Sequence, residues 1–202
     1  MINNEYGQIL EVLNSSGIII PRIRASVIIP TYQKMDSLEK VLIALAKQTY
    51  PENLFEVIVS DDGSVDDTAE LVKNFKMHSP YRLRFITHEH DGYQLSKTRN
   101  EGINIANCEV VVLLDADMVP VQEFLTNHMR WHHLFQNIAV LGHRRYVEPH
   151  HISLEMLVSN PEKLWDIPKT LHKGFNYDID WREEKYKKNN YLRSEPEPWW
   201  FF

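Results

Sequence analysis

Two carboxylates lie two residues apart at the end of a long apolar run: Asp115 and Asp117 follow residues 110–114. Side chains two positions apart on an extended segment point in the same direction, so both carboxylates can face one ligand. Carboxylate oxygens suit Mg²⁺ or Mn²⁺, which usually take one or two carboxylates together with substrate phosphates. The pair therefore predicts a metal site. A strand that runs into an acidic turn would give the same pattern, so the rest of the chain must decide.

Three further polar groups follow a predicted strand or begin a predicted helix. A carboxylate beyond a strand, such as Asp62, can accept a hydrogen bond from the imide N–H of uracil, which cytosine lacks. A ring such as Tyr32 can flank the base, and Arg99 near the start of a helix can face a diphosphate. The three groups are Pro30-Thr31-Tyr32, Asp61-Asp62-Gly63-Ser64 and Arg99-Asn100.

Each of these residues also has a simpler explanation. Ser64, Asp67 and Asp36 could be helix N-caps, with Glu39 as the capping-box partner of Asp36, and Arg99 could be a solvated helix residue. Caps alone do not explain why four polar groups coincide with strand ends. We therefore predict a ligand site at the carboxyl ends of the strands, where open α/β sheets bind nucleotides.

The elements that would hold these residues alternate along the chain. Four strand–helix repeats predict an α/β fold with a mostly parallel central sheet flanked by helices on both faces. The apolar run at 110–114 predicts a strand buried on both faces. We expect Pro30 to end the first strand and Pro120 to lie in the first turn of a helix. The predicted strands are 25–29, 55–59, 81–86, 110–114 and 138–141, and the predicted helices lie around 5–13, 38–46, 71–75, 95–106, 121–129 and 153–158.

Composition limits the classes of protein that fit. The chain has 202 residues and a formal net charge of −6, so it offers no positive field to attract nucleic acid. No apolar run approaches the roughly 20 residues of a membrane span, which leaves only peripheral membrane contact open. A single cysteine, Cys108, excludes an internal disulfide and fits a reducing compartment, so we expect a cytoplasmic protein.

Four motifs in order resemble family 2 glycosyltransferases of the GT-A fold. They are Ser26–Tyr32, Val59–Asp66, Leu95–Gly102 and Leu113–Asp117. The resemblance covers about residues 25–147 and is nearest to the bacterial chondroitin-polymerase type, partly through Gly142–Val147. It implies a metal-dependent, inverting transfer of a sugar from a UDP-sugar to the hydroxyl of a saccharide or another acceptor, in polysaccharide or glycoconjugate synthesis.

The resemblance also implies roles for single residues. Asp62 matches the carboxylate that reads uracil, Asp115 the carboxylate near ribose and metal, and Asp117 the direct metal ligand for Mn²⁺ or Mg²⁺. Gln33 departs from the family pattern, which commonly has asparagine there, and we expect little effect. The implied nucleotide-sugar contacts are Pro30, Thr31, Tyr32, Asp61, Asp62, Arg99, Asn100, Asp115 and Ala116.

The expected organisation has three parts: a helical extension and linker over 1–24, a nucleotide-sugar-binding domain over 25–147, and a lid-like loop with the start of an acceptor-side region over 148–202. In the family, the general base is an aspartate in a Glu-Asp pair that follows an aromatic segment. Residues 199–202 resemble the start of that segment, so we expect the base beyond Phe202 and a chain that is the donor-binding part of an enzyme.

Two other classes of function compete with this interpretation. The chain could be a module that binds a UDP-sugar without turning it over. A sugar-1-phosphate nucleotidyltransferase has a similar α/β layout, but it needs a glycine-rich loop after the first strand, and residues 30–36 contain no glycine. A phosphohydrolase with two carboxylates would not explain Asp61 and Asp62.

Overall fold

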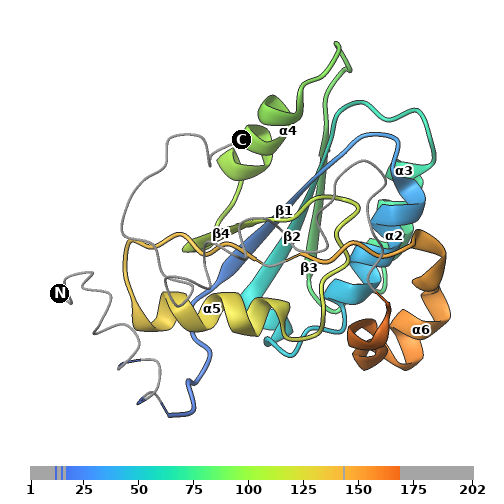
Figure 1. Cartoon of the computed structure of the whole chain (residues 1–202). Coiled ribbons are helices and arrows are strands. Elements are labelled where there is room, and N and C mark those ends of the chain that lie inside the picture. Colours follow the sequence, from blue (N-terminus) through green and yellow to red (C-terminus); the bar gives the residue numbers. More distant parts are fainter. Residues whose placement is uncertain (1–11, 13–14, 16, 143, 169–202) are drawn as a thin grey trace, which may run out of the picture.

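The computed structural model describes residues 12, 15, 17–142 and 144–168. Most of the helix that we predict over 5–13 and most of the predicted lid lie outside the described residues. Four strands alternate with helices in the described part (Figure 1). The strands are β1 Ala25–Thr31, β2 Phe55–Asp61, β3 Arg82–Thr87 and β4 Val110–Leu113. The α-helices are α2 Met35–Leu45, α3 Thr68–Lys76, α4 Leu95–Asn104, α5 Phe124–Leu134 and α6 Leu154–Ser159.

The strands form one parallel sheet in the order β3-β2-β1-β4. Parallel neighbours in this order need a helical crossover between consecutive strands, and α2, α3 and α4 provide it. The register sets Thr31 opposite Asp61 and Asp61 opposite Thr87. The predicted α/β architecture is therefore confirmed, and the polar residues after β1, β2 and β3 end at one edge.

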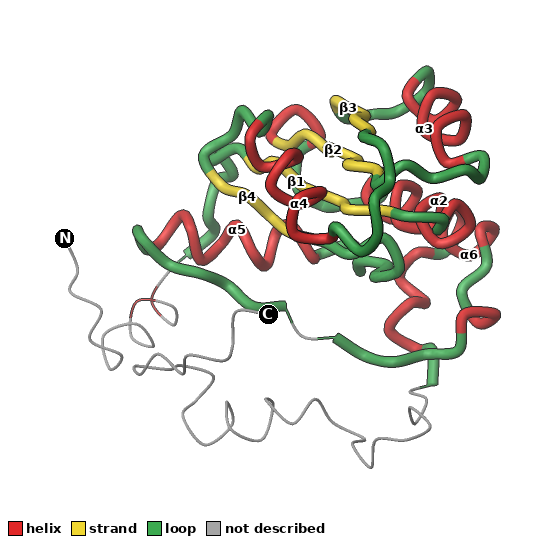
Figure 2. The backbone as a smooth tube through the Cα atoms, turned by 90° about the horizontal axis from the view of Figure 1, so that it is seen from above, coloured by secondary structure: helices red, strands yellow, loops and turns green. Residues whose placement is uncertain are grey.

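The two faces of the sheet carry different helices (Figures 1 and 2). On one face, alternate residues of β1 and β2 form a buried core with the apolar stripe of α2 and with residues of α3 and α5. That stripe is the predicted one, since Leu38, Val41, Leu42 and Leu45 are all fully buried. On the other face, α4 alone among the described helices covers β1 and β2.

Helix α4 approaches the sheet closely because it carries Gly102. A methyl group at this position would come within 2.4 Å of Ile28 Cγ2 on β1. Ile28 is fully buried, so it has no free space to yield. The absence of a side chain at position 102 therefore sets the height of α4 above the sheet, and with it the height of Arg99.

The prediction that the 110–114 strand is buried on both faces is wrong. β4 is an edge strand among the described strands, and its residues are alternately buried and exposed. Val112 lies in the core, whereas Val111 and Leu113 are 40% and 51% exposed. The cause is that α4 contacts β1 and β2, so no described helix covers this face of β4.

The predicted helix caps also need correction. Helix α2 begins at Met35, and the expected capping box of Asp36 and Glu39 does not form. The first amide of α2 is bound from another loop: Asp66 Oδ2 accepts from the Met35 amide at 3.2 Å, and Asp66 Oδ1 accepts from the Thr68 amide and hydroxyl at the start of α3. Burial raises the pKa of Asp66, but these hydrogen bonds outweigh it and hold the pKa below its ordinary value.

Both proline predictions fail for a local reason. Pro30 lies inside β1, which runs on to Thr31. Proline has no amide hydrogen to donate, and the strand tolerates it because the pairing of β1 with β4 already ends at Ile28, two residues earlier. Pro120 precedes α5, which begins only at Phe124. The predicted strand at 138–141 does not join the sheet.

The predicted short helix near 153–158 is confirmed as α6, capped by the Ser153 hydroxyl, which accepts from the Met156 amide. Two 3₁₀ turns, Pro149–His151 and Pro161–Asp166, flank this helix, and a third, Glu52–Leu54, precedes β2. Leu157, Leu164 and Ile167 form a second small core against Ala44 of α2. In the part of the chain that the structure describes, no helix is long and apolar enough to cross a membrane.

Candidate functional site

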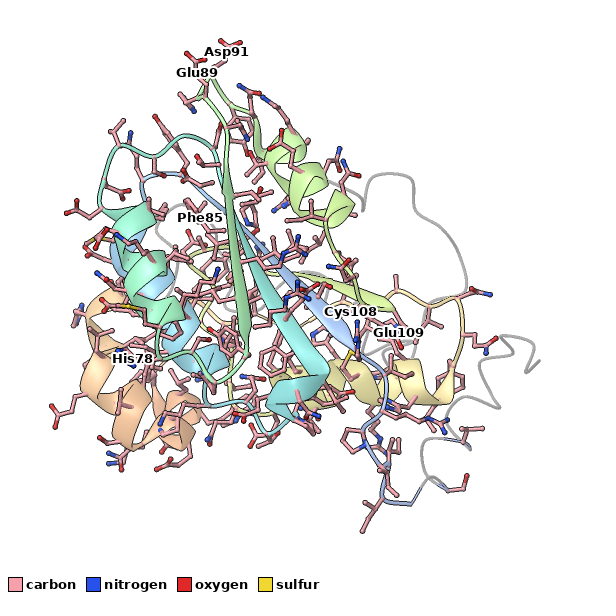
Figure 3. All side chains as sticks on the ribbon, turned by 180° about the vertical axis from the view of Figure 1, so that it is seen from behind. His78, Phe85, Glu89, Asp91, Cys108 and Glu109 are labelled. Carbon is pink, nitrogen blue, oxygen red and sulfur yellow. The ribbon has the colours of Figure 1, made fainter. Side chains whose placement is uncertain are left out.

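Four loops meet at the carboxyl edge of the sheet, where the sequence predicts a site. They follow β1, β2, β3 and β4, and parallel pairing requires that all four leave the same edge. The loop after β3 projects furthest, with Glu89 and Asp91 at its tip (Figure 3). This edge thus brings together the predicted residues of α4 and of the loops after β1, β2 and β4. The loop after β3 also lies there, which the sequence did not predict.

Asp61 is turned inward and holds two loops together. Its carboxylate accepts from the Ser64 amide at 3.0 Å, from the Ser64 hydroxyl at 2.5 Å and from the Thr87 hydroxyl at 2.8 Å. The residue is buried. Ser64 therefore fastens Asp61 rather than capping a helix, and the carboxylate of Asp61 has its hydrogen-bonding capacity largely filled within the protein.

Asp62 faces two histidines from the loop after β3. Its Oδ1 lies 2.9 Å from His88 Nε2, and its Oδ2 lies 3.2 Å from His90 Nδ1. The other ring nitrogen of His88 lies 2.7 Å from Glu101 Oε2 on α4, so this ring bridges two carboxylates. Only a doubly protonated ring can donate to both. Because Asp62 is only 6% exposed, this contact fixes the direction of its carboxylate.

Tyr32 lies beside Asp62 and stacks on His90. The two rings are 4.1 Å apart at their centroids and 9° from parallel. Next to Tyr32, Gln33 has a positive φ of 50° and donates from its side chain to the Tyr32 hydroxyl at 3.0 Å. Asparagine is among the non-glycine residues that best tolerate positive φ, which explains physically why asparagine suits this position.

The acidic pair after β4 is compensated by two cations. Arg99 of α4 donates to Asp115 Oδ1 at 2.6 Å, and Lys34 Nζ lies 3.5 Å from Asp117 Oδ2. Asp115 and Asp117 are both exposed, whereas Ala116 between them is buried, as the predicted alternation requires. The strand itself ends at Leu113, so the pair lies in a turn closed by a bond from the Met118 amide to the Asp115 carbonyl.

The remaining predicted residues are divided between buried and exposed positions. Pro30 and Thr31 are buried, and the Thr31 carbonyl accepts from the Asp62 amide at 2.9 Å. Asn100 is exposed on α4. Two buried polar atoms at this edge, Thr31 Oγ1 and Arg99 Nε, have no hydrogen-bond partner among the described residues. Such atoms are rare in folded proteins and are consistent with a polar ligand here.

The acidic pair offers a divalent cation two carboxylates and no third protein ligand of the same kind among the described residues. Within the described ranges, no cluster of three or more His, Cys, Asp or Glu side chains could hold a metal ion. Asp115 and Asp117 alone, exposed on one side of the chain, suit a Mg²⁺ or Mn²⁺ ion that obtains its other ligands from water and from a substrate diphosphate. The residues thus fit a cation that binds together with its substrate.

Four contact residues were missed by the sequence predictions: His88, His90, Glu101 and Lys34. A signal for the histidines exists, because they alternate directly after a strand, in the position that made the other three loops candidates. Glu101 and Lys34 carry no such signal. Both lie on or beside helices, where an acidic or basic residue is ordinarily a solvated one.

Comparison with known proteins agrees with this geometry. The family described as glycosyl transferase family 2 matches residues 26–182. Chondroitin synthase from Pasteurella multocida is 32% identical over 187 residues, which are 88% of this chain and 19% of that protein. The chain thus spans about a fifth of the length of that relative.

Two solved structures show the same fold. The chain is 31% identical to Staphylococcus aureus TarS 1–349 in complex with UDP-GlcNAc, with a TM-score of 0.50 over 54% of this chain and 30% of that one. It is 28% identical to the mannosyltransferase PcManGT from Pyrobaculum calidifontis in complex with GDP-Man and Mn²⁺, with a TM-score of 0.51 over 62% of this chain and 38% of that one. Both neighbours have the GT-A fold, which confirms the predicted fold. The chain therefore belongs to glycosyl transferase family 2.

Proposed function

We propose that this chain is the donor-binding part of an inverting glycosyltransferase that takes a UDP-sugar together with Mn²⁺ or Mg²⁺. The observation that carries the proposal is the order of side chains along the carboxyl edge. The sheet order β2-β1-β4 lines up Asp62, Tyr32 and the pair Asp115 and Asp117. Two strand spacings, about 10 Å, separate the outer members, which leaves room for a ribose between a base and a diphosphate.

In this arrangement each residue has one task. The Asp62 carboxylate accepts from the imide N–H of uracil, and the Tyr32 ring stacks on the base. Arg99 can turn from Asp115 to the diphosphate, since guanidinium groups pair equally well with carboxylate and phosphate. Asp115 and Asp117 would hold the cation, which when bound would balance the charge on the departing diphosphate. Residues 25–147 would form this donor domain.

The solved neighbours support the two ligands. The TarS structure was obtained with UDP-GlcNAc and the mannosyltransferase structure with GDP-Man and Mn²⁺. The relation to chondroitin synthase supports a place in polysaccharide synthesis, with the hydroxyl group of a saccharide or another molecule as the acceptor.

Calorimetric titration with UDP tests the proposal. We expect UDP to bind in the presence of Mn²⁺ and to bind much more weakly in chelator, because the acidic pair and the diphosphate repel each other without a cation. Asp117→Ala should abolish the difference between the two conditions. Asp67→Ala is the matched control, because Asp67 is an exposed aspartate whose side chain caps no helix. Equal affinity of the unaltered chain with Mn²⁺ and with chelator would overturn the metal assignment.

A further inference from the structure

His90 makes the same two contacts that the proposed function assigns to a uracil ring. Its imidazole stacks on Tyr32, with centroids 4.1 Å apart and planes within 9°. Its Nδ1 lies 3.2 Å from Asp62 Oδ2, and it also donates to the Asp62 backbone carbonyl at 3.1 Å. A flat ring on the tyrosine with a ring nitrogen at the carboxylate is the arrangement expected of the base itself.

While both histidines are in place, their rings lie against the Asp62 carboxylate and fill the space that a base would need. The two carboxylate oxygens of Asp62 face His88 and His90, and the residue is almost fully buried. One of the two rings must therefore move when a base arrives. The side chain of His88 is 12% exposed and is held between two carboxylates, whereas that of His90 is 32% exposed and contacts one carboxylate, that of Asp62. His90 is the ring that can leave.

The backbone around His90 is built for a close approach. Gly63, directly after Asp62, has a φ of 69°, and a methyl group there would come within 2.6 Å of the His90 amide nitrogen and 2.8 Å of the His88 carbonyl oxygen. The loop after β3 therefore rests on the backbone of the loop after β2. This contact holds the His90 backbone in place, while rotation about its side-chain bonds is enough to carry the ring away from Asp62.

We propose that His90 occupies the base subsite in the free protein and that a uridine nucleotide must displace it. The inference rests on the proposed function, because it takes Asp62 and Tyr32 as the base subsite. His90 thus competes with the nucleotide for the same space. The apparent dissociation constant of the nucleotide equals its intrinsic value divided by the fraction of molecules in which the His90 ring has left the base subsite. His88, in contrast, remains and keeps the Asp62 carboxylate aimed at the vacated space.

The test compares UDP with inorganic pyrophosphate, both with Mn²⁺, on the unaltered chain and on His90→Ala. We expect the dissociation constant of UDP to fall at least about threefold in His90→Ala, because the competitor is gone, whereas that of pyrophosphate stays unchanged. His90→Phe keeps a ring on Tyr32 but loses the nitrogen, so it should lie between the two. His78→Ala is the matched control, since His78 is an exposed histidine at the opposite end of the molecule from Glu89 and Asp91 (Figure 3).

A second measurement follows the ring directly. In a proton–carbon NMR spectrum recorded with the diamagnetic ion Mg²⁺, the ring signals of His90 should shift on addition of UDP and stay in place on addition of pyrophosphate. The inference would be overturned if His90→Ala bound UDP no more tightly than the unaltered chain, or if the His90 signals did not shift on addition of UDP. Either result would leave the proposed function intact. No UDP binding by either the unaltered chain or His90→Ala would overturn the proposed function itself. UDP binding that appears only in His90→Ala would support both.

Discussion

Gly102→Ala probes the packing that sets α4, and Arg99 on it, above the sheet. The new methyl group would lie 2.4 Å from Ile28 Cγ2, about 1 Å closer than ordinary contact, and Ser60 Cβ would lie at 3.6 Å. Overpacking a filled core typically costs about 1–3 kcal/mol, and alanine returns up to about 1 kcal/mol in helix propensity. We expect a net loss of about 1–2 kcal/mol in the free energy of unfolding.

Denaturant and thermal unfolding measure this loss. For a chain of this size it corresponds to a fall of about 2–8 °C in Tm. Lys97→Ala is the matched control on the same helix, because Lys97 is exposed and its replacement should change Tm little. If the donor site is as proposed, UDP binding with Mn²⁺ should also weaken in Gly102→Ala, since a shift of α4 displaces Arg99.

A double-mutant cycle with Ile28→Ala can refute the reasoning. Ile28→Ala alone should cost about 2–5 kcal/mol, because it leaves a cavity under α4. The alanine at position 102 would then fill part of that cavity. The loss of unfolding free energy in the double variant should therefore be smaller than the sum of the two single losses by about 1 kcal/mol or more. Strictly additive losses would show that the methyl group at 102 does not meet Ile28.

Three further predictions concern base choice, capping and acid stability. Asp62→Asn should shrink a preference for UDP over CDP, which in the unaltered chain we expect to be about 1–3 kcal/mol from the facing, unpaired acceptors, and competition binding with the two nucleotides measures it. Asp66→Ala should lower the free energy of unfolding by about 1–2 kcal/mol, because Met35 and Thr68 lose their caps, and urea titration should show less loss in Asp66→Asn. Burial, and then the charge of His132, lower the pKa of His128 below its ordinary 6.5, so the unfolded chain binds the proton more readily and stability should fall as pH drops below about 6.5. Unfolding midpoints of His128→Gln, measured from pH 7 to pH 5, should fall less steeply than those of the unaltered chain.

The fold could be predicted because its signals are periodic. The stripe Leu38, Val41, Leu42 and Leu45 is amphipathic, and it is buried in the structure as the pattern requires. The burial of β4 could not be predicted in the same way. An apolar run reports that a strand can be covered on both faces, but its neighbours in the sheet decide whether it is, and Val111 and Leu113 remain exposed because α4 lies over β1 and β2.

The position of the site at the carboxyl edge of the sheet could be predicted from the sequence, but the contacts between its side chains could not. Parallel pairing forces Asp62 and Asp115 to the same edge, and that follows from the alternation of strands and helices alone. The pairing of Asp62 with His88 and His90 joins positions 26 and 28 residues apart, between two irregular loops. No period links such positions, so local sequence reasoning describes the loop after β3 as merely polar.

The wrong cap predictions share one cause, and it bears on how the edge is held. Asp36, Ser64 and Asp67 have cap-type side chains near helix starts, yet none of them caps its helix. The bonds run between loops instead: Ser64 joins Asp61 to the Gln33 amide, and Asp66 joins the start of α2 to that of α3. Because each bond links segments that follow different strands, loss of one should loosen two loops together. The loops after β1, β2 and β3 thus hold one another in place, and the groups proposed to bind a nucleotide are positioned by their neighbours before any ligand arrives.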